Sequence, residues 1–130
     1  MPNSPVQPRG ELSLRTVAMP GDTNPNGDIF GGWIMSLMDL AAGIAAGTRA
    51  KGRVATAAVS NLSFHQPVKV GDVVCVYTEI TKTGRTSMTI GVETYVLRRN
   101  RGERVRVTSA EFVLVAVDDH GTPRVLPPEG

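Results

Sequence analysis

Between Ile29 and Thr48 the chain has a single charged residue, Asp39, in a segment otherwise made mainly of apolar and small residues. A carboxylate taken out of water is strongly disfavoured unless it is hydrogen-bonded, paired or protonated. An acid in such a segment is therefore expected to have a partner, a perturbed pKa or a function. Its carboxylate can act as a general base on water, or attack an electrophile directly as a nucleophile. Asp39 is therefore the first candidate catalytic residue.

The segment just before this acid is rich in residues that form turns and helix caps. Asn24 and Gly27 are typical of turns, and the pair Gly31-Gly32 lets other atoms approach the backbone closely. A helix that begins near this pair presents free N–H groups and the positive end of its dipole. Such amides can hold a negative charge that develops on a substrate oxygen. Gly31 and Gly32 are therefore candidate binding residues.

Helical spacing divides the segment that carries the acid into two faces. One face is narrow and lined with small residues, so another helix or a ligand can lie close to it. It comprises Gly32, Met35, Asp39, Ala42 or Gly43, and Ala46. The opposite face is expected to be buried on the protein's own sheet. It comprises Ile34, Leu37, Met38, Ala41 and Ala45.

Alternation of apolar residues, bounded by turn residues, predicts five strands around one long helix. The helix is expected to end between Gly47 and Gly52, where basic residues suit the negative end of its dipole. The strands are expected at Glu11–Met19, Val54–Phe64, Val73–Thr81, Thr86–Leu97 and Arg104–Val117. This is an α+β pattern: a five-stranded antiparallel sheet wrapped on one central helix. The sheet's edges and the second face of the helix remain uncovered, which predicts at least a dimer.

Length and composition fit one globular domain, with 130 residues of which 41% are apolar. We expect a flexible lead over residues 1–10 and a single domain over residues 11–130. Two histidines and one cysteine argue against a zinc site with Cys and His ligands and against a disulfide framework, and we expect no metal. The lone Cys75 is expected to be buried in a strand.

The polar, proline-rich N-terminus does not have the pattern of a signal peptide. The longest apolar stretch is interrupted by Asp39 and is too short to span a bilayer. We therefore expect a soluble cytoplasmic protein with no membrane partner. A net charge of +2 and an aromatic content of 5% argue against a nucleic-acid partner, whereas a modest basic excess suits a phosphorylated small molecule.

The run DTNPNGDIFGGWIMSLMD, residues 22–39, closely resembles the signature of YciA-type acyl-CoA thioesterases, members of the hotdog-fold superfamily. The resemblance extends over roughly residues 11–127. It includes Leu14-Arg15-Thr16, Met19-Pro20, Phe64, Pro67-Val68, residues 70–74, Thr86-Ser87, Val117-Asp118, Pro123-Arg124 and Leu126-Pro127. The departures are minor: His65 and Gln66 stand where related sequences often have an apolar residue and Arg.

This resemblance implies a fold, an assembly and a set of site residues. The fold is a helix wrapped by an antiparallel sheet, and two subunits pair their sheets edge to edge. The dimers often assemble further into trimers of dimers, which are hexamers. Asp39 is implied as the catalytic carboxylate, with Asn24 assisting from the partner protomer. The implied substrate is an acyl-CoA, and no cofactor is expected because coenzyme A is part of the substrate.

Thioester hydrolysis requires a nucleophilic water and donors for the carbonyl oxygen that becomes negative. Asp39 can supply the first, either as a general base or by direct attack to give a mixed anhydride, and the residues do not separate these routes. The amides of Gly31 and Gly32 can supply the second. Asp39 lies seven residues after Gly32, about 10.5 Å along a continuous helix. We therefore predict composite sites, two per dimer, in which the helix start of one subunit faces the acid of the other.

Coenzyme A carries phosphates that require basic side chains or backbone donors. The expected contacts are Arg85, Thr86 and Ser87 at a hairpin edge, and Arg53 near the end of the helix. The basic segment of residues 98–106 is most often a hairpin with solvated charges, but it can also contact the phosphates of a neighbouring subunit's coenzyme.

The candidate residues also have structural readings. Asp39 can be held by a backbone N–H or a hydroxyl across a dimer interface. Asn24 can close an Asx turn, and Asp28 can cap the helix. The glycine pair can serve close packing only, and Trp33 is more readily an interface or pocket-wall residue than a catalytic one. His65 can flank a pocket, and His120 is expected in a solvent-exposed turn.

Two other functions compete with hydrolysis. Hydratases and dehydratases that act on acyl thioesters have a catalytic His in the loop and helix segment, whereas this chain has no His between Met19 and Lys51. A non-catalytic acyl-CoA-binding regulatory module would use the same pocket to sense its ligand. Such a module has no use for Asn24 and Asp39, so their presence favours the enzyme.

Overall fold

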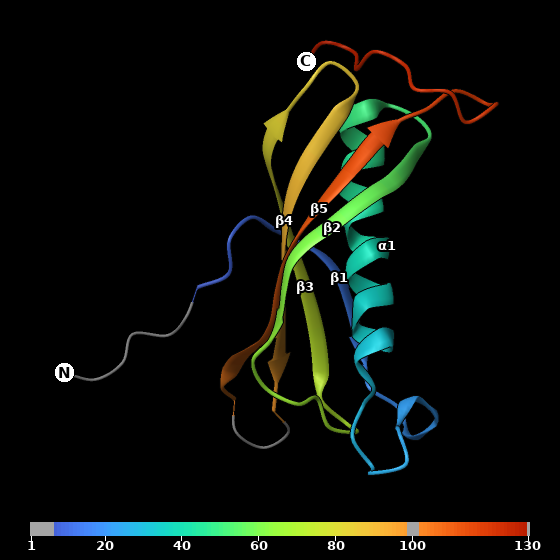
Figure 1. Cartoon of the computed structure of the whole chain (residues 1–130). Helices are drawn as coiled ribbons and strands as arrows, with labels where there is room; N and C mark the ends of the chain where they lie inside the picture. The colour runs from blue at the N-terminus through green and yellow to red at the C-terminus, as the bar shows by residue number, and fades with distance from the viewer. Residues whose placement is uncertain (1–6, 99–101, 130) are drawn as a thin grey trace.

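The computed structural model describes residues 7–98 and 102–129, which form five strands, one long helix and one short 3-10 helix (Figure 1). In chain order they are β1 (Glu11–Val17), η1 (Pro20–Asp22), α1 (Gly31–Ala50), β2 (Val54–Phe64), β3 (Val73–Thr83), β4 (Ser87–Leu97) and β5 (Arg104–Ala116). The helix and all five strands were predicted, and β2 has the predicted bounds. Residues 1–6 of the predicted flexible lead and residues 99–101 of the basic segment lie outside the described residues.

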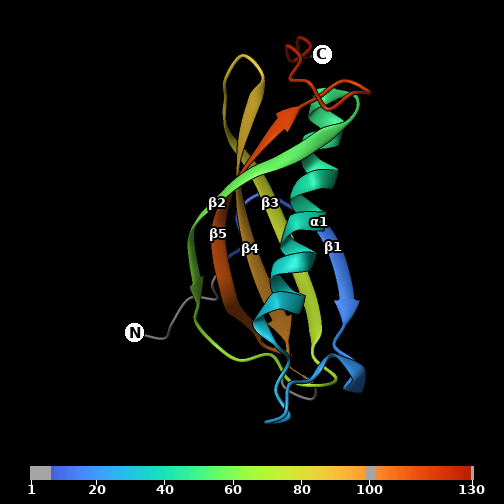
Figure 2. The ribbon, with the colours of Figure 1, turned by 45° about the vertical axis from the view of Figure 1, so that its right-hand side comes forward.

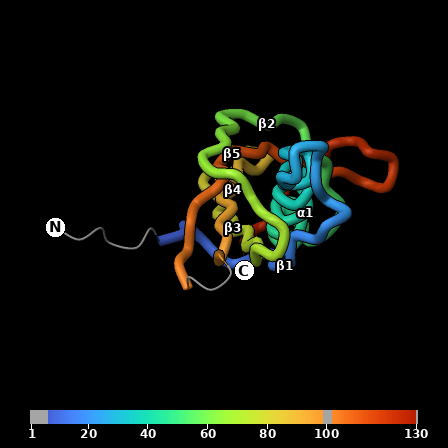
Figure 3. The backbone as a smooth tube through the Cα atoms, turned by 90° about the horizontal axis from the view of Figure 1, so that it is seen from below, coloured from blue at the N-terminus to red at the C-terminus, as the bar shows by residue number. Residues whose placement is uncertain are grey.

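The five strands form one antiparallel sheet in the order β1-β3-β4-β5-β2. The short connections explain why β3, β4 and β5 are neighbours, because antiparallel strands joined by tight turns pair with each other. β1 and β2 form the two outer edges. The end-on view shows α1 between these edges, with the sheet curved around it (Figure 3). In Figure 2 the helix runs along one face of the sheet. The predicted α+β architecture is confirmed.

The core lies between α1 and the concave face of the sheet. Its helix side chains are Ile34, Met38, Ala41, Ala42, Ala46 and Ala50, and its sheet side chains include Val74, Val76, Ile90, Val92, Phe112 and Leu114. Of the two alternatives predicted for the open face, Gly43 lies there, beside Asp39, and Ala42 is buried. The prediction that Ala46 belongs to the open face is wrong, because the curved sheet covers a wider arc of the helix than a flat one. The small alanines let the strands approach, and Met38 fills the space between them. Met38→Ala would remove that filling at a cost of about 2–5 kcal/mol.

The helix begins at Gly31, as expected from the glycine pair. The preceding residue, Phe30, has an extended backbone and makes no side-chain capping contact. The reading of Asp28 as the helix cap is therefore wrong. Its carboxylate instead forms an ion pair with Lys69 Nζ, from the connection between β2 and β3.

The other end of the helix is closed by Lys51 and by the C-terminal segment, residues 117–129. Lys51 has a left-handed backbone with a φ of 53° and donates its N–H to Gly47 O. The C-terminal segment, red in Figure 1, crosses this end, where Arg49 Nη1 donates to Pro127 O at 2.7 Å. In the part of the chain that the structure describes, no helix is long and apolar enough to cross a membrane.

β2 has a partner on one side only, because it is the last strand of the sheet. Nearly all of its residues are exposed, including Val59 and Phe64. Leu40 and Ile44 on the neighbouring surface of α1 are 54% and 47% exposed. A long unpaired strand beside an apolar helix surface is a template for another chain. The uncovered edge and helix face that the sequence predicts are therefore both present at β2.

Candidate active site

Asp39 lies in the middle of α1, facing β2. Thr56 Oγ1 donates a hydrogen bond to Asp39 Oδ1 at 2.5 Å. The two residues line a cavity of about 330 Å³ together with Leu40, Gly43, Ile44, Val54 and Leu114. Asp39 is exposed in the single chain, so the protein's own fold does not withdraw this carboxylate from water. The surface that would cover it is the open side of β2.

The hydroxyl contact was missed by sequence analysis, which considered only a contact across a dimer interface. Thr56 Oγ1 can donate, and it orients one oxygen of the carboxylate. Asp39 Oδ2 has no hydrogen-bond partner among residues 7–98 and 102–129, so this oxygen can accept a further hydrogen bond. The signal was present in the sequence, because alternation in β2 places Val54 and Thr56 on the same face, toward the helix.

Gly31 and Gly32 occupy the first two positions of α1. The N–H of Trp33 donates to Phe30 O at 3.1 Å, while the N–H groups of both glycines have no acceptor in the described structure. They are therefore available for an anion, at the positive end of the helix dipole. The ring of Phe64 packs on Gly31, where an added Cβ would lie 3.1 Å from its Cζ atom.

A second cavity of about 330 Å³ opens beside these amides. It is lined by Ile29, Gly31, Ile34, Phe64, His65, Gln66, Pro67 and Val68. The expectation that His65 flanks a pocket is confirmed, and its Nε2 lies 3.2 Å from Ser109 Oγ. The segment that leads into the helix is held against this loop, because Ile29 donates its N–H to Val68 O at 3.1 Å.

Asn24 closes the turn before the helix, as its structural reading predicts. Its Oδ1 accepts the backbone N–H groups of Asn26 at 2.9 Å and Asp28 at 3.1 Å. Its backbone N–H donates to Asp28 O at 2.7 Å. These contacts use the carbonyl oxygen and leave the side-chain NH₂ group without a protein acceptor in the described residues. The amide of Asn24 is therefore held in one orientation with its donor free.

A single chain does not bring the acid and the helix-start amides together. Gly31 and Asp39 are eight residues apart on one continuous helix, about 12 Å along its axis. They line separate cavities, one beside Phe64 at the end of β2 and the other beside Thr56 near its start. Both cavities open on the side of the helix that faces the edge strand β2.

Comparison with known proteins identifies the family. The model of the thioesterase superfamily matches residues 26–103. This chain belongs to the thioesterase superfamily. The acyl-CoA thioester hydrolase YciA of Salmonella typhimurium is 52% identical over 126 residues, which are 95% of each chain. The enzyme of the same name from Escherichia coli is 50% identical over 94% of this thioesterase and 95% of its own length.

Solved structures agree with the fold. The hexameric thioesterase of Yersinia pestis is 54% identical with a TM-score of 0.90, covering 95% of this thioesterase and all of that chain. The hexameric hotdog-fold thioesterase of Campylobacter jejuni is 40% identical with a TM-score of 0.86, covering 91% of each chain. The predicted hotdog fold and the predicted membership of the YciA-type acyl-CoA thioesterases are therefore confirmed.

The four residues predicted to contact coenzyme A lie at the other end of the thioesterase, near the end of α1. Arg53 is exposed at the start of β2, where its Nη1 donates to Asp119 O at 3.0 Å. Arg85 precedes β4, and its carbonyl accepts the N–H of Leu126 at 2.9 Å. Thr86 follows in the same turn, Ser87 is the first residue of β4, and both are half-buried. The C-terminal segment thus contacts both arginines.

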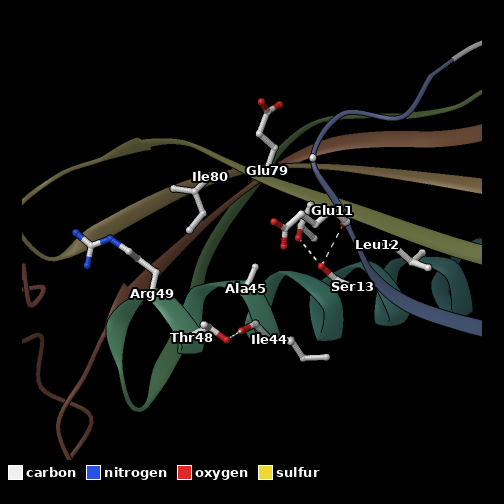
Figure 4. Close-up of a pocket in the computed structure, with 11 residues that line it drawn as sticks. Glu11, Leu12, Ser13, Ile44, Ala45, Thr48, Arg49, Glu79 and Ile80 are labelled. Carbon is white, nitrogen blue, oxygen red and sulfur yellow. Dashed lines mark hydrogen bonds between the residues drawn. The ribbon is translucent and has the colours of Figure 1, made fainter. Parts of the chain in front are cut away.

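A larger cavity of about 580 Å³ lies on the opposite side of α1, between the helix, β1 and β3 (Figure 4). The helix contributes Ile44, Ala45, Thr48 and Arg49, and the strands contribute Glu11, Leu12, Ser13, Glu79 and Ile80, among others. None of the predicted site residues lines it. The acid and the free helix-start amides lie instead at the two smaller cavities.

The remaining reactive side chains lie away from the cavity beside Asp39 and the cavity beside Gly31. Cys75 is buried in β3, as predicted, and His120 is exposed in the C-terminal segment, as predicted. Two backbone N–H groups, of Thr122 and His120, lower the pKa of the Asp118 carboxyl in the same turn. Within residues 7–98 and 102–129, no three His, Cys, Asp or Glu side chains gather as a metal site would require.

Proposed function

We propose that this thioesterase hydrolyses acyl-CoA to a free acid and coenzyme A, with Asp39 as its catalytic carboxylate. The observation that carries the proposal is the Asp39 carboxylate itself, held by Thr56 at the wall of an open cavity. The YciA enzymes that it resembles over nearly their whole length are named acyl-CoA thioester hydrolases. An acid with one oxygen oriented and the other free suits either form of catalysis.

In the general-base route, Asp39 Oδ2 takes a proton from a water whose oxygen attacks the thioester carbonyl carbon. The tetrahedral intermediate then breaks its C–S bond, and the departing thiolate recovers the proton from Asp39. In the nucleophilic route, the carboxylate attacks the same carbon and expels the thiolate. Water then cleaves the resulting anhydride, restores the carboxylate and supplies the proton of the thiol. Both routes leave a free acid and coenzyme A.

In both routes the carbonyl oxygen becomes negative, and the amides of Gly31 and Gly32 are the proposed donors to it. Donors of this kind must lie about 3 Å from that oxygen. The spacing along α1 prevents one chain from meeting this requirement at Asp39. We therefore propose a site shared between two subunits, in which the helix start and Asn24 of one protomer meet Asp39 of the other.

A second copy of the chain fits the open edge at β2. Pairing of β2 with the same strand of a partner would continue the antiparallel sheet and cover Val59, Leu40 and the cavity beside Asp39. The relatives from Yersinia pestis and Campylobacter jejuni are described as hexameric. We propose the same stoichiometry here, as a trimer of such dimers.

The pairing of Asn24 with Asp39 has support from a more distant relative. An acyl-CoA hydrolase of Staphylococcus aureus, 28% identical with a TM-score of 0.81, is known in complex with butyryl-CoA and coenzyme A. Structures also exist of its variants with one Asn or one Asp changed to Ala. The two substituted positions are separated in that chain by the same number of residues as Asn24 and Asp39 here.

For the phosphates of coenzyme A, Arg53 and Arg85 are the proposed ligands, with the hydroxyls of Thr86 and Ser87. Arg53 directly precedes Val54, which lines the cavity beside Asp39. It lies three residues from Thr56, about 10 Å along β2. A substrate with its thioester at Asp39 can therefore extend its nucleotide end toward these basic side chains.

The test is release of the free thiol from acyl-CoA substrates of increasing chain length. We expect the wild-type protein to be active, Asp39→Ala to lose at least about a thousandfold in kcat, and Asn24→Ala to lose less. Circular dichroism and thermal unfolding confirm that each variant is folded. A folded Asp39→Ala protein that is as active as the wild type would show that this carboxylate is not catalytic.

Sharing of the site is tested by subunit exchange. Asp39→Ala and Asn24→Ala proteins with different tags are mixed, and the mixed dimers are purified through both tags. In a mixed dimer of the proposed geometry, one of the two sites has both residues intact, so activity returns to about half of the wild-type value. If both residues belong to the site of one protomer, every site of the mixed dimer lacks one of them, and its activity would not exceed the mean of the two parent variants.

A further inference from the structure

A buried ion pair lies beneath the loop that faces the helix start. Arg98 Nη1 donates to Asp72 Oδ2 at 2.6 Å, and Asp72 is only 3% exposed. Arg98 follows β4, and Asp72 precedes β3. Removing Arg98 would leave the buried Asp72 carboxylate unpaired, which is strongly destabilising. Neither residue belongs to the sites described above.

This ion pair fixes the connection between β2 and β3 at two points. The second guanidinium nitrogen of Arg98, Nη2, donates to Pro67 O at 2.8 Å. The same carboxylate oxygen of Asp72 accepts the backbone N–H of Lys69 at 2.8 Å. Arg98 and Asp72 therefore hold the segment from Pro67 to Lys69 at both ends, and Val68 within it is fully buried.

The side chain of Lys69 extends this anchor to the turn before the helix. Its Nζ forms an ion pair with Asp28 Oδ1. Asp28 is in turn joined to Asn24 by two hydrogen bonds, since its N–H donates to Asn24 Oδ1 at 3.1 Å and its carbonyl accepts the Asn24 N–H at 2.7 Å. A continuous series of contacts thus runs from Arg98 through Asp72, Lys69 and Asp28 to Asn24.

We propose that Lys69 is a positioning residue for Asn24, acting through Asp28 and anchored by the Asp72–Arg98 pair. The inference rests on the proposed function, in which the Asn24 amide assists hydrolysis. The side chains of Lys69 and Asp28 are 55% and 38% exposed, and exposed ion pairs contribute little to stability. The proposed role of Lys69 is therefore to fix geometry and not to stabilise the fold. Its ion pair keeps Asp28 in the position from which the backbone of Asp28 orients the Asn24 amide.

The test is a double-mutant cycle between Lys69→Met and Asn24→Ala, with Lys82→Met as the matched control. Lys82 is exposed on β3 and belongs to no site described above. Lys69→Met is expected to lower kcat about tenfold, leave KM within about twofold and leave the melting temperature within about 2 °C. Lys82→Met changes none of the three. Lys69→Arg, which keeps the charge, restores most of kcat.

In the Asn24→Ala background, Lys69→Met is expected to lower kcat by less than about twofold, because its effect passes through the missing amide. Hydrogen exchange provides a readout independent of activity: amides of residues 24–32 exchange faster in Lys69→Met, while those of β3 and β4 do not change. An equal loss of kcat in both backgrounds, or unchanged exchange in residues 24–32, overturns the proposal.

Failure of the proposed function gives a different pattern. If Asn24→Ala is as active as the wild type, the proposal about Lys69 falls with the role of Asn24, while Asp39→Ala still decides whether the carboxylate is catalytic. If Asn24→Ala is impaired and Lys69→Met is not, hydrolysis at the shared site stands and the role of Lys69 alone is refuted.

Discussion

Thr56 donates its hydroxyl to Asp39 Oδ1 at 2.5 Å, and this contact joins the middle of α1 to the edge strand β2. It engages one carboxylate oxygen and leaves the other without a hydrogen-bond partner in the described residues. The strand that would meet a second subunit therefore also orients the carboxylate that we propose as catalytic. Movement of β2 would be transmitted to Asp39 through a single hydroxyl.

Replacing Thr56 removes the hydrogen bond that orients Asp39 while the carboxylate itself stays in place. Thr56→Val is nearly isosteric and removes the donor, so we expect kcat to fall about tenfold to a hundredfold, because a hydrogen bond to a charged group contributes ~1.5–3 kcal/mol. Thr56→Ser keeps the hydroxyl and should retain most activity. The kcat of each variant is measured by steady-state thiol release from one acyl-CoA. Equal kcat values for Thr56→Val and Thr56→Ser would contradict an orienting role for the hydroxyl.

Gly31 is required by the ring that packs on it. A Cβ at this position would lie 3.1 Å and 3.3 Å from two ring atoms of Phe64, which is tighter than ordinary packing. We expect Gly31→Ala to lose about 1–3 kcal/mol of stability and to lower kcat by shifting the helix-start amides. Adding Phe64→Leu should recover part of both losses.

The control for this substitution is Gly21→Ala, because an added Cβ at Gly21 meets nothing within 4 Å. Denaturant unfolding and thiol release are measured on all variants. If Gly31→Ala and Gly21→Ala behave alike, contact with Phe64 does not determine the residue at the start of the helix.

A charge on the open edge should separate the subunits. Val59 is 40% exposed in the middle of β2, and a carboxylate there would face its equivalent in a partner that pairs along this strand. We expect Val59→Glu to shift the protein toward smaller species in light scattering after size-exclusion chromatography, with loss of activity. Val125→Glu, at a 55% exposed position in the C-terminal segment, is the control. A Val59→Glu protein of unchanged mass would place the interface elsewhere.

Tyr95 makes the stability sensitive to alkaline pH. Burial first, and then the neighbouring Glu93 carboxylate, raise the pKa of the Tyr95 phenol above its ordinary value of 10.0. The unfolded chain therefore loses this proton before the folded one does, and the free energy of unfolding falls as the pH rises through the ordinary value. Tyr95→Phe lacks this group, so its stability should fall less between about pH 9 and 11. Parallel denaturant-unfolding curves for the two proteins over this range would refute the assignment.

The elements were predictable because their signals are local. Alternation and turn residues place β2 and the hairpin strands, and the glycine pair marks the start of α1. The site was predictable only in part. The alternation of β2 places Thr56 toward the helix, but its contact with Asp39 also depends on the register between the strand and the helix, which no local pattern contains. The role of Asp28 was misread for a similar reason, because its partner Lys69 is 41 residues away in the chain.

The exposure of Asp39 in the single chain also differs from what its sequence neighbours indicate. A lone acid among apolar residues indicated a carboxylate withdrawn from water, whereas Asp39 is exposed in the single chain. The apolar residues around it, Leu40 and Ile44, are exposed too. Exposed apolar residues of this kind are typical of a surface that contacts a second subunit. A helix with one face in its own core and another in an interface has the same apolar sequence pattern as a fully buried helix.

The order of the strands also has a consequence for biosynthesis. β2 joins the sheet only through β5, the last strand to leave the ribosome, because its pairing partner is residues 104–116. Until β5 is made, β2 has no place in the sheet and cannot present a complete edge to a neighbouring nascent chain. The proposed pairing of two subunits along β2 therefore requires residues 104–116 to have been synthesised, so we expect each subunit to complete its own sheet before it offers this edge to a partner.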